Sequence, residues 1–140
     1  MTDLSIFAYT LTVPQSAIDQ NGHVNNVTFL QWMQDAAIRH GQEWLKGYTG
    51  FDENGTFVAR EHRIIYLLPA VLGEELEVRT WVNEVKRVRA HRRYEFIRKS
   101  DGIAVVKGET DWVYVDIKTG RPTAIPAHIF DVFKVLPDPS

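Results

Sequence analysis

The sequence predicts an α+β fold in which one long helix packs against a five-stranded antiparallel sheet. Three observations lead to this expectation. Apolar residues recur every three or four positions in one long segment, five other segments alternate with a period of two, and turn-forming residues separate the strands. A single amphipathic helix can bury its apolar stripe only by lying on the concave face of such a sheet. The chain has 140 residues, 44% of them apolar, which suits one domain over residues 1–140.

The first predicted element is a strand over Leu4–Val13, where apolar residues alternate loosely until a proline ends the run. The long helix follows over Val27–Leu45, with polar residues opposite its apolar stripe. Asn25 or Asn26 caps its start, because an asparagine side chain accepts hydrogen bonds from the free amides of the first turn. The helix is expected to end at two glycines, Gly47 and Gly50.

Four longer extended runs follow the helix. In one of them Leu76, Val78 and Val82 alternate with polar and charged residues, the pattern of a strand with one buried face. Turns rich in glycine, proline or charge separate the runs, and we expect them to form an antiparallel meander. The runs are Thr56–Leu68, Glu75–Lys86, Ala90–Lys99 and Ile103–Asp116, and a short amphipathic helix or coil is expected over Pro126–Val135.

Charge and composition narrow the classes of function. The formal net charge is −2, with acids and bases spread along the chain, so the sequence indicates neither nucleic acid nor a membrane surface as a partner. The absence of cysteine removes disulfides, thiolate nucleophiles and thiolate metal sites. We expect a cytoplasmic protein, because the sequence shows neither a secretory leader nor an apolar run of the ~20 residues that a membrane span needs.

The segment Asp19–Asn26, DQNGHVNN, concentrates polar side chains directly before the predicted helix. A helix start offers unpaired backbone N–H groups and the positive end of the helix dipole, which favour an anion, including an oxyanion formed in a transition state. Asp19 adds a carboxylate in a glycine-containing turn that can fold back over the helix start. A carboxylate so placed can attack a carbonyl or take a proton from water. The segment therefore predicts a hydrolase site, although Asp, Asn and Gly are also common turn formers.

The pattern Asp19-x-x-Gly22-His23-Val24-Asn25-Asn26, followed by Phe29-Leu30, resembles the active-site loop of hotdog-fold acyl thioesterases of the 4-hydroxybenzoyl-CoA thioesterase type. The HVNN tetrad followed by an aromatic residue also resembles the acyl carrier protein (acyl-ACP) thioesterases. The likeness covers nearly the whole chain, including Tyr66-Leu67-Leu68-Pro69 before Gly73-Glu74-Glu75-Leu76 and a closing Gly120-Arg121-Pro122. It implies a hotdog fold, hydrolysis of an acyl-CoA or acyl-ACP thioester, and homodimers or homotetramers that join sheets edge to edge, with active sites at the interface.

The resemblance also assigns roles to residues. Asp19 takes the place of the catalytic aspartate, as nucleophile or general base, and the backbone N–H of Asn26 would bind the thioester oxygen. Asn21 and His23 match positions that have catalytic or orienting roles in the acyl-ACP branch. A second branch uses a glutamate on the central helix, but neither acid of the predicted helix lies in a matching motif.

Other interpretations of the same residues remain open. His23 would bond only the backbone if its role were structural, and Asn25 would act as a helix cap. A competing hypothesis for this chain is a non-hydrolytic module on the same fold that binds acyl-CoA or an acyl carrier. A dehydratase acting on 3-hydroxyacyl thioesters is a third class, although its usual histidine–glutamate arrangement on the helix is not evident.

The run Lys86–Arg93, KRVRAHRR, gathers five of the sixteen formal cations. Such a run is usually a solvated face, but arginine forks also suit the phosphates of coenzyme A or the acidic surface of an acyl carrier protein. We predict Arg87, Arg89 and Arg92 as residues that bind this part of the substrate. Coenzyme A or phosphopantetheine would enter only as part of the substrate, so no separate cofactor is expected. No metal is expected either, because the five histidines show neither ligand spacing nor clustered carboxylates.

Overall fold

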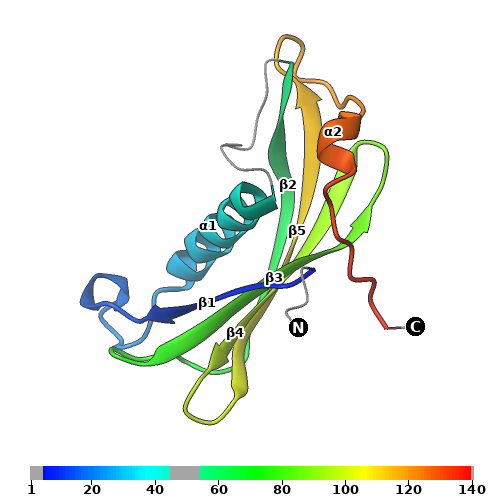
Figure 1. The fold of residues 1–140 in the computed structure, drawn as a ribbon. Helices are drawn as coiled ribbons and strands as arrows, with labels where there is room; N and C mark the ends of the chain where they lie inside the picture. The colour runs from blue at the N-terminus through cyan, green and yellow to red at the C-terminus, as the bar shows by residue number, and fades with distance from the viewer. Residues whose placement is uncertain (1–4, 45–53, 140) are drawn as a thin grey trace.

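The computed structural model describes residues 5–44 and 54–139 and shows a long helix lying across one face of a five-stranded sheet (Figure 1). This confirms the predicted α+β class, with one long helix and five strands. The predicted helix end at Leu45, Gly47 and Gly50, and the strand start at Leu4, lie outside the described residues. The elements are β1 (Phe7–Thr12), a short 3-10 helix η1 (Gln15–Ala17), α1 (Asn26–Trp44), β2 (Gly55–Tyr66), β3 (Glu75–Val85), β4 (Arg89–Arg98), β5 (Ile103–Asp116) and α2 (Ala127–Phe130).

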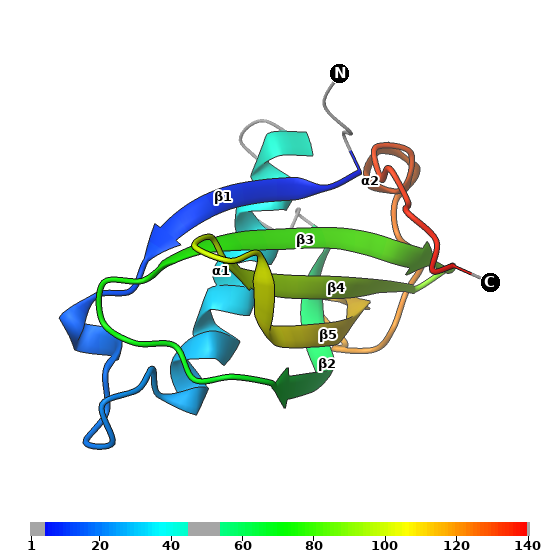
Figure 2. The same ribbon diagram turned by 90° about the horizontal axis from the view of Figure 1, so that it is seen from below.

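The strands follow the order β1-β3-β4-β5-β2, and all neighbours are antiparallel (Figure 2). The predicted four-strand meander is therefore wrong for β2, which pairs with β5 at one edge of the sheet instead of with β3. Loop length explains the difference. Three residues join β3 to β4, but eight separate Tyr66 from Glu75, which is too many for a tight hairpin and leaves room to cross to the other edge.

The core lies between α1 and the sheet. Phe29, Met33 and Ala36 of α1 are buried against apolar residues of β3, β4 and β5. Gly108 of β5 permits this close approach, because a Cβ at that position would lie 2.7 Å from Met33 Sδ. Burying a large apolar side chain contributes about 1.5–3 kcal/mol, so this stripe holds α1 in place along the sheet. The sheet residues of this core are Leu76, Val78, Tyr94, Phe96, Val105 and Val106.

The C-terminal segment runs beside β3 where β1 no longer covers it. β1 pairs with β3 only as far as Thr80, and beyond that point the Leu136 N–H donates to the Val82 C=O at 2.9 Å. Asp138 then forms an ion pair with Arg93 of β4, with 2.7 Å between Oδ2 and Nη2. The segment thus completes the sheet edge that β1 leaves short.

Within residues 5–44 and 54–139, no helix has the length and apolar character needed to cross a membrane.

Candidate active site

A cleft of about 410 Å³ lies where the start of α1 meets the loop before it and the segment that follows β2. One wall is the polar Asp19–Asn26 loop, and the other is the apolar end of β2 with the residues after it. The lining residues are Asp19, Asn21, His23, Val24, Asn25, Asn26, Phe29, Tyr66, Leu67, Leu68, Pro69 and Ala70.

Backbone hydrogen bonds close the loop that carries Asp19. The Asp19 N–H donates to the His23 C=O (2.9 Å), and the Gly22 N–H donates to the Asp19 C=O (3.0 Å). Gly22 has a φ of +79°, in the left-handed region that favours glycine. The Asn21 N–H donates to Asp19 Oδ1 at 2.8 Å. One carboxylate oxygen is therefore held in the turn, while the other makes no hydrogen bond to any described residue.

At the start of α1, one backbone N–H group has no acceptor in the part of the chain that the structure describes. Asn25 is the cap, because its Oδ1 accepts the Val27 N–H at 2.8 Å and its C=O accepts the Thr28 N–H at 3.0 Å. Directly before these two amides, the N–H of the exposed Asn26 has no hydrogen-bond partner among the described residues. This free donor stands at the positive end of the helix dipole, where a developing negative charge is stabilised.

Tyr66 joins the end of β2 to the start of α1. Its hydroxyl donates to the Asn26 C=O at 2.9 Å, and its ring lies edge-on to Phe29, with 6.1 Å between centroids. Burial raises the pKa of the Tyr66 phenol, so the group stays a neutral donor around pH 7. Sequence reasoning did not identify Tyr66 as a site residue. An aromatic residue directly before the Leu67-Leu68-Pro69 run was the available signal.

The four predicted catalytic residues line this cleft together: Asp19, Asn21, His23 and Asn26. Asp19 is half-buried, and the other three are exposed. The backbone C=O of His23 accepts a hydrogen bond from the Asp19 N–H and so helps to close the loop. The structure therefore brings these residues to one place, while their chemical roles stay predictions.

The three predicted phosphate-binding arginines are not brought together. Side chains alternate along β4, so Arg92 faces α1 and is 5% exposed, whereas Arg89 lies on the opposite face of the sheet. Arg87 is exposed in the turn between β3 and β4. Arg92 thus belongs to the interior and shares no surface with Arg89.

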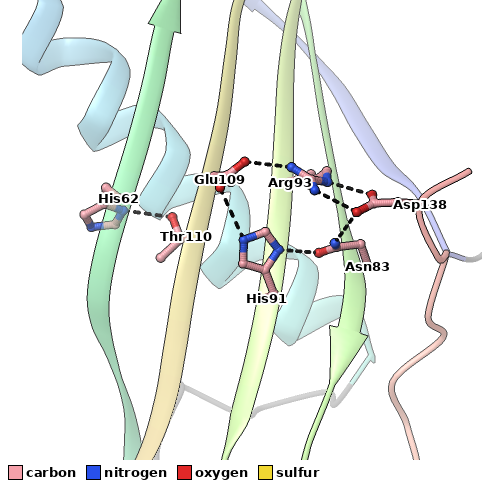
Figure 3. A network of polar contacts seen from close by, with 7 residues as sticks. All are labelled: His62, Asn83, His91, Arg93, Glu109, Thr110 and Asp138. Atoms are coloured by element: carbon pink, nitrogen blue, oxygen red, sulfur yellow. Dashed lines mark hydrogen bonds and ion pairs between the residues drawn. The ribbon is translucent and has the colours of Figure 1, made fainter. Parts of the chain in front are cut away.

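The outer face around Arg89 carries both signs of charge. Arg93 donates to Asp138 and Glu109 at 2.7 Å each, and His91 bonds Asn83 at 2.7 Å (Figure 3). Acidic and basic side chains alternate in this shallow hollow, so most of its cations already have a protein partner. The hollow is lined by Asn83, Glu84, Lys86, Arg89, His91, Arg93, Glu109, Asp111 and Asp138.

The basic turn and the Asp19 cleft stand at opposite ends of one protomer. β3 begins just after the cleft residue Ala70 and runs for 11 residues to the turn that carries Arg87, a length of about 35 Å. Within one copy of the chain, Arg87 and Arg89 therefore do not reach the cleft. Among the described residues, no three His, Asp or Glu side chains are grouped closely enough to hold a metal ion.

Comparison with known families identifies the class of protein that this fold and cleft define. The chain belongs to the thioesterase-like superfamily, whose family model matches residues 13–133. A search of curated protein sequences found no match.

Solved structures confirm the hotdog fold expected from the sequence. The chain resembles a predicted thioesterase from Bacillus stearothermophilus, with 20% identity, a TM-score of 0.82, and 96% of this chain and 99% of that one covered. It also resembles the DHNA-CoA thioesterase from Staphylococcus aureus, with 17% identity, a TM-score of 0.79, and 90% and 85% covered. A hypothetical protein from Staphylococcus aureus, solved in complex with CoA, shares 22% identity and a TM-score of 0.78, with 96% and 89% covered.

Proposed function

We propose that the protein hydrolyses an acyl thioester, acyl-CoA or acyl-ACP, to a free acid and a thiol. The observation that carries the proposal is that the Asp19 carboxylate and the Asn26 N–H line one cleft. Among the described residues, neither the second carboxylate oxygen of Asp19 nor the Asn26 N–H has a hydrogen-bond partner. Membership of the thioesterase-like superfamily supports the same reaction class.

In this proposal the helix start stabilises the negative charge that forms on the thioester oxygen. The carbonyl oxygen lies against the Asn26 N–H, which no described protein group occupies. One such donor typically lowers the barrier by ~3–4 kcal/mol, and the helix dipole adds to it. The Tyr66 hydroxyl acts indirectly, because it fixes the Asn26 C=O and hence the local backbone.

Asp19 acts as the nucleophile or the general base through Oδ2, the carboxylate oxygen that accepts no hydrogen bond from a described residue. Either Oδ2 forms a bond to the carbonyl carbon while the C–S bond breaks, giving an anhydride that water then hydrolyses, or the carboxylate takes a proton from a water that attacks the same carbon. In both routes the electron pair of the C–S bond leaves on sulfur. Because a thiolate is a stable leaving group, no separate general acid is required.

Asn21 and His23 are proposed to orient the substrate or the attacking water. Both have exposed side chains on the rim of the cleft, and no described protein group makes a hydrogen bond to either side chain. They are therefore available to a ligand.

The carrier of the acyl group is proposed to be coenzyme A in the first instance. Two of the similar structures support this choice, since one is named a DHNA-CoA thioesterase and the other was solved with CoA. An acyl carrier protein presents the same phosphopantetheine thioester, so both carriers belong in the test.

We further propose that two copies join through β2, as in the edge-to-edge dimers that the resemblance implies. Among the described strands, β2 is an edge strand that pairs with β5, and it exposes the apolar side chains of Val58 and Ile65. An edge strand with exposed apolar side chains favours pairing with a strand of another chain. Antiparallel pairing of two β2 strands would place the basic turn of the second copy, with Arg87 and Arg89, at the cleft end of the first.

Thiol release tests the proposed function directly. The chain contains no cysteine, so a thiol reagent reports only the thiol freed from the substrate. We expect turnover in a panel of short, long and aromatic acyl-CoAs and one acyl-ACP. Tight binding of acyl-CoA without any release of thiol would contradict the proposal and would favour a binding module on the same fold.

A further inference from the structure

A second cavity lies at the other end of α1, between the last turns of the helix, the sheet and the segment around α2. Its volume is about 210 Å³, and its walls are mainly aliphatic and aromatic. It shares no residue with the Asp19 cleft. The lining residues are Ala37, Ile38, Gly41, Trp44, Thr56, Phe57, Val82, Ala90, Arg92, Trp112, Ile129, Val132 and Phe133.

Arg92 is the charged residue in this apolar wall. It is 5% exposed, and its Nη1 donates to His40 Nδ1 (2.8 Å) and to Thr80 Oγ1 (3.1 Å). A guanidinium can only donate, so His40 accepts at Nδ1, and its imidazole is the neutral form. Burial lowers the pKa of Arg92 to about 10, which still leaves it positively charged around pH 7.

The charge on Arg92 has no counterion among the described residues. Both groups that accept its hydrogen bonds are neutral, and its Nε and Nη2 make no hydrogen bond to a described residue. A buried cation without an anion is costly in free energy. The side chain therefore offers two unused donors, in the fork geometry that matches a carboxylate.

Two neighbours fit a ligand in the same cavity. The indole N–H of Trp44 is buried and has no hydrogen-bond partner among the described residues, and Arg92 lies over the Trp44 ring at 5.8 Å. Gly41 lies within α1, where glycine costs about 0.5–1 kcal/mol relative to alanine. A Cβ on Gly41 would meet no atom within 4 Å, so the missing side chain leaves open space in the cavity wall.

We propose that this cavity binds a small carboxylic acid with an apolar body, whose carboxylate pairs with Arg92. A cavity of about 150 Å³ holds a benzene ring, and the 210 Å³ here leaves room for a ring with one carboxylate. A phosphate or diphosphate group fits poorly, because most of the walls are apolar and carry a single cation. The ligand class follows from the cavity alone and does not depend on the proposed hydrolysis.

Calorimetric titration of the full chain with benzoate and with benzyl alcohol tests the inference. Benzyl alcohol has the same ring without the charge. We expect one benzoate per chain and a dissociation constant for benzyl alcohol about tenfold or more higher, because the alcohol leaves the buried charge unpaired. Absence of benzoate binding at millimolar concentration, or equal affinity for the two compounds, would overturn the inference.

Two variants locate the binding site. Gly41→Leu fills the cavity from a helical position with free space, and we expect it to abolish benzoate binding without loss of stability. Arg92→Gln removes the charge and should weaken benzoate about tenfold or more, while Arg121→Gln, an exposed change outside the cavity, should leave affinity unchanged. If Arg92→Gln does not fold, Gly41→Leu and the alcohol decide the question. Unchanged benzoate affinity in Gly41→Leu would place binding elsewhere and refute the assignment.

Discussion

Replacing Gly22 by alanine tests whether the shape of the Asp19 loop controls the proposed reaction. The backbone φ at Gly22 is +79°, and a Cβ there would meet no atom within 4 Å. The substitution therefore adds backbone strain and no collision. That strain is about 1–2 kcal/mol for an L-residue, offset in part by the ~0.4–1 kcal/mol that alanine gains by restricting the unfolded chain. We expect the free energy of unfolding to fall by about 1 kcal/mol and Tm to fall by about 3 °C.

The strain at Gly22 should also displace the carboxylate. The Gly22 N–H bonds the Asp19 C=O at 3.0 Å, and the Asp19 N–H bonds the His23 C=O at 2.9 Å, so a change of φ between them moves Asp19. A shift of about 1 Å in a reacting group costs on the order of 100-fold in rate. We expect kcat/KM for acyl-CoA to fall about 10- to 100-fold, because the loop relaxes only partly.

Gly120→Ala is the matched control. Gly120 has a φ of +70° and equally open surroundings, but it lies in the turn after β5, at the end of the sheet away from the cleft. Urea unfolding should show a similar loss of stability in both variants. Thiol release should show lowered kcat/KM only in Gly22→Ala. Equal activity in the two variants would refute the reasoning that the loop positions Asp19.

Three further substitutions test separate contacts. Asn25→Ala removes the cap of α1 and should cost about 1 kcal/mol of stability by urea unfolding; a loss near zero would contradict its role as cap. Tyr66→Phe removes the hydrogen bond to the Asn26 C=O. It should lower the free energy of unfolding by about 0.5–1.5 kcal/mol and should also lower kcat; an unchanged kcat would contradict a role for Tyr66 in the site. Hydrogen bonding to Arg93 lowers the pKa of Asp138, so this carboxylate stabilises the fold above the ordinary aspartate range, about pH 4, and the contribution is lost as the pH falls through the lowered value. Asp138→Asn should therefore destabilise the protein most near neutral pH and progressively less as the pH falls below about 4, and an effect that does not change with pH would contradict the ion pair.

Local patterns predicted most of the fold because they depend on neighbouring residues. The three- and four-residue spacing of Phe29, Met33 and Ala36 predicts the buried stripe of α1, and the period of two predicts the strands. The place of β2 depends instead on how an eight-residue connection crosses the sheet. The length of that connection was the signal against a hairpin, but hydrophobic alternation carries no information on which edge a strand joins.

The candidate site was likewise predictable only where its residues are neighbours in the sequence. Asp19 and Asn26 lie in one short segment, so the sequence could place both near the helix start. Tyr66 reaches Asn26 across 40 positions, and Arg92 reaches His40 across 52. Such contacts follow from the register of the sheet against α1, which periodicity alone does not give. The alternation along β4 was visible in the sequence and would have separated Arg92 from Arg89.

The kcat/KM of Asp19→Asn for an acyl-CoA substrate, measured by thiol release, tests the central claim most directly. Asparagine keeps an oxygen that can accept the Asn21 N–H, so the loop is retained while the negative charge is lost. Asp116→Asn is the control, since Asp116 Oδ1 also accepts backbone N–H groups in a turn, at the far end of β5. We predict a fall of about 100-fold or more for Asp19→Asn and no change for Asp116→Asn. Wild-type turnover in a folded Asp19→Asn variant would contradict the account.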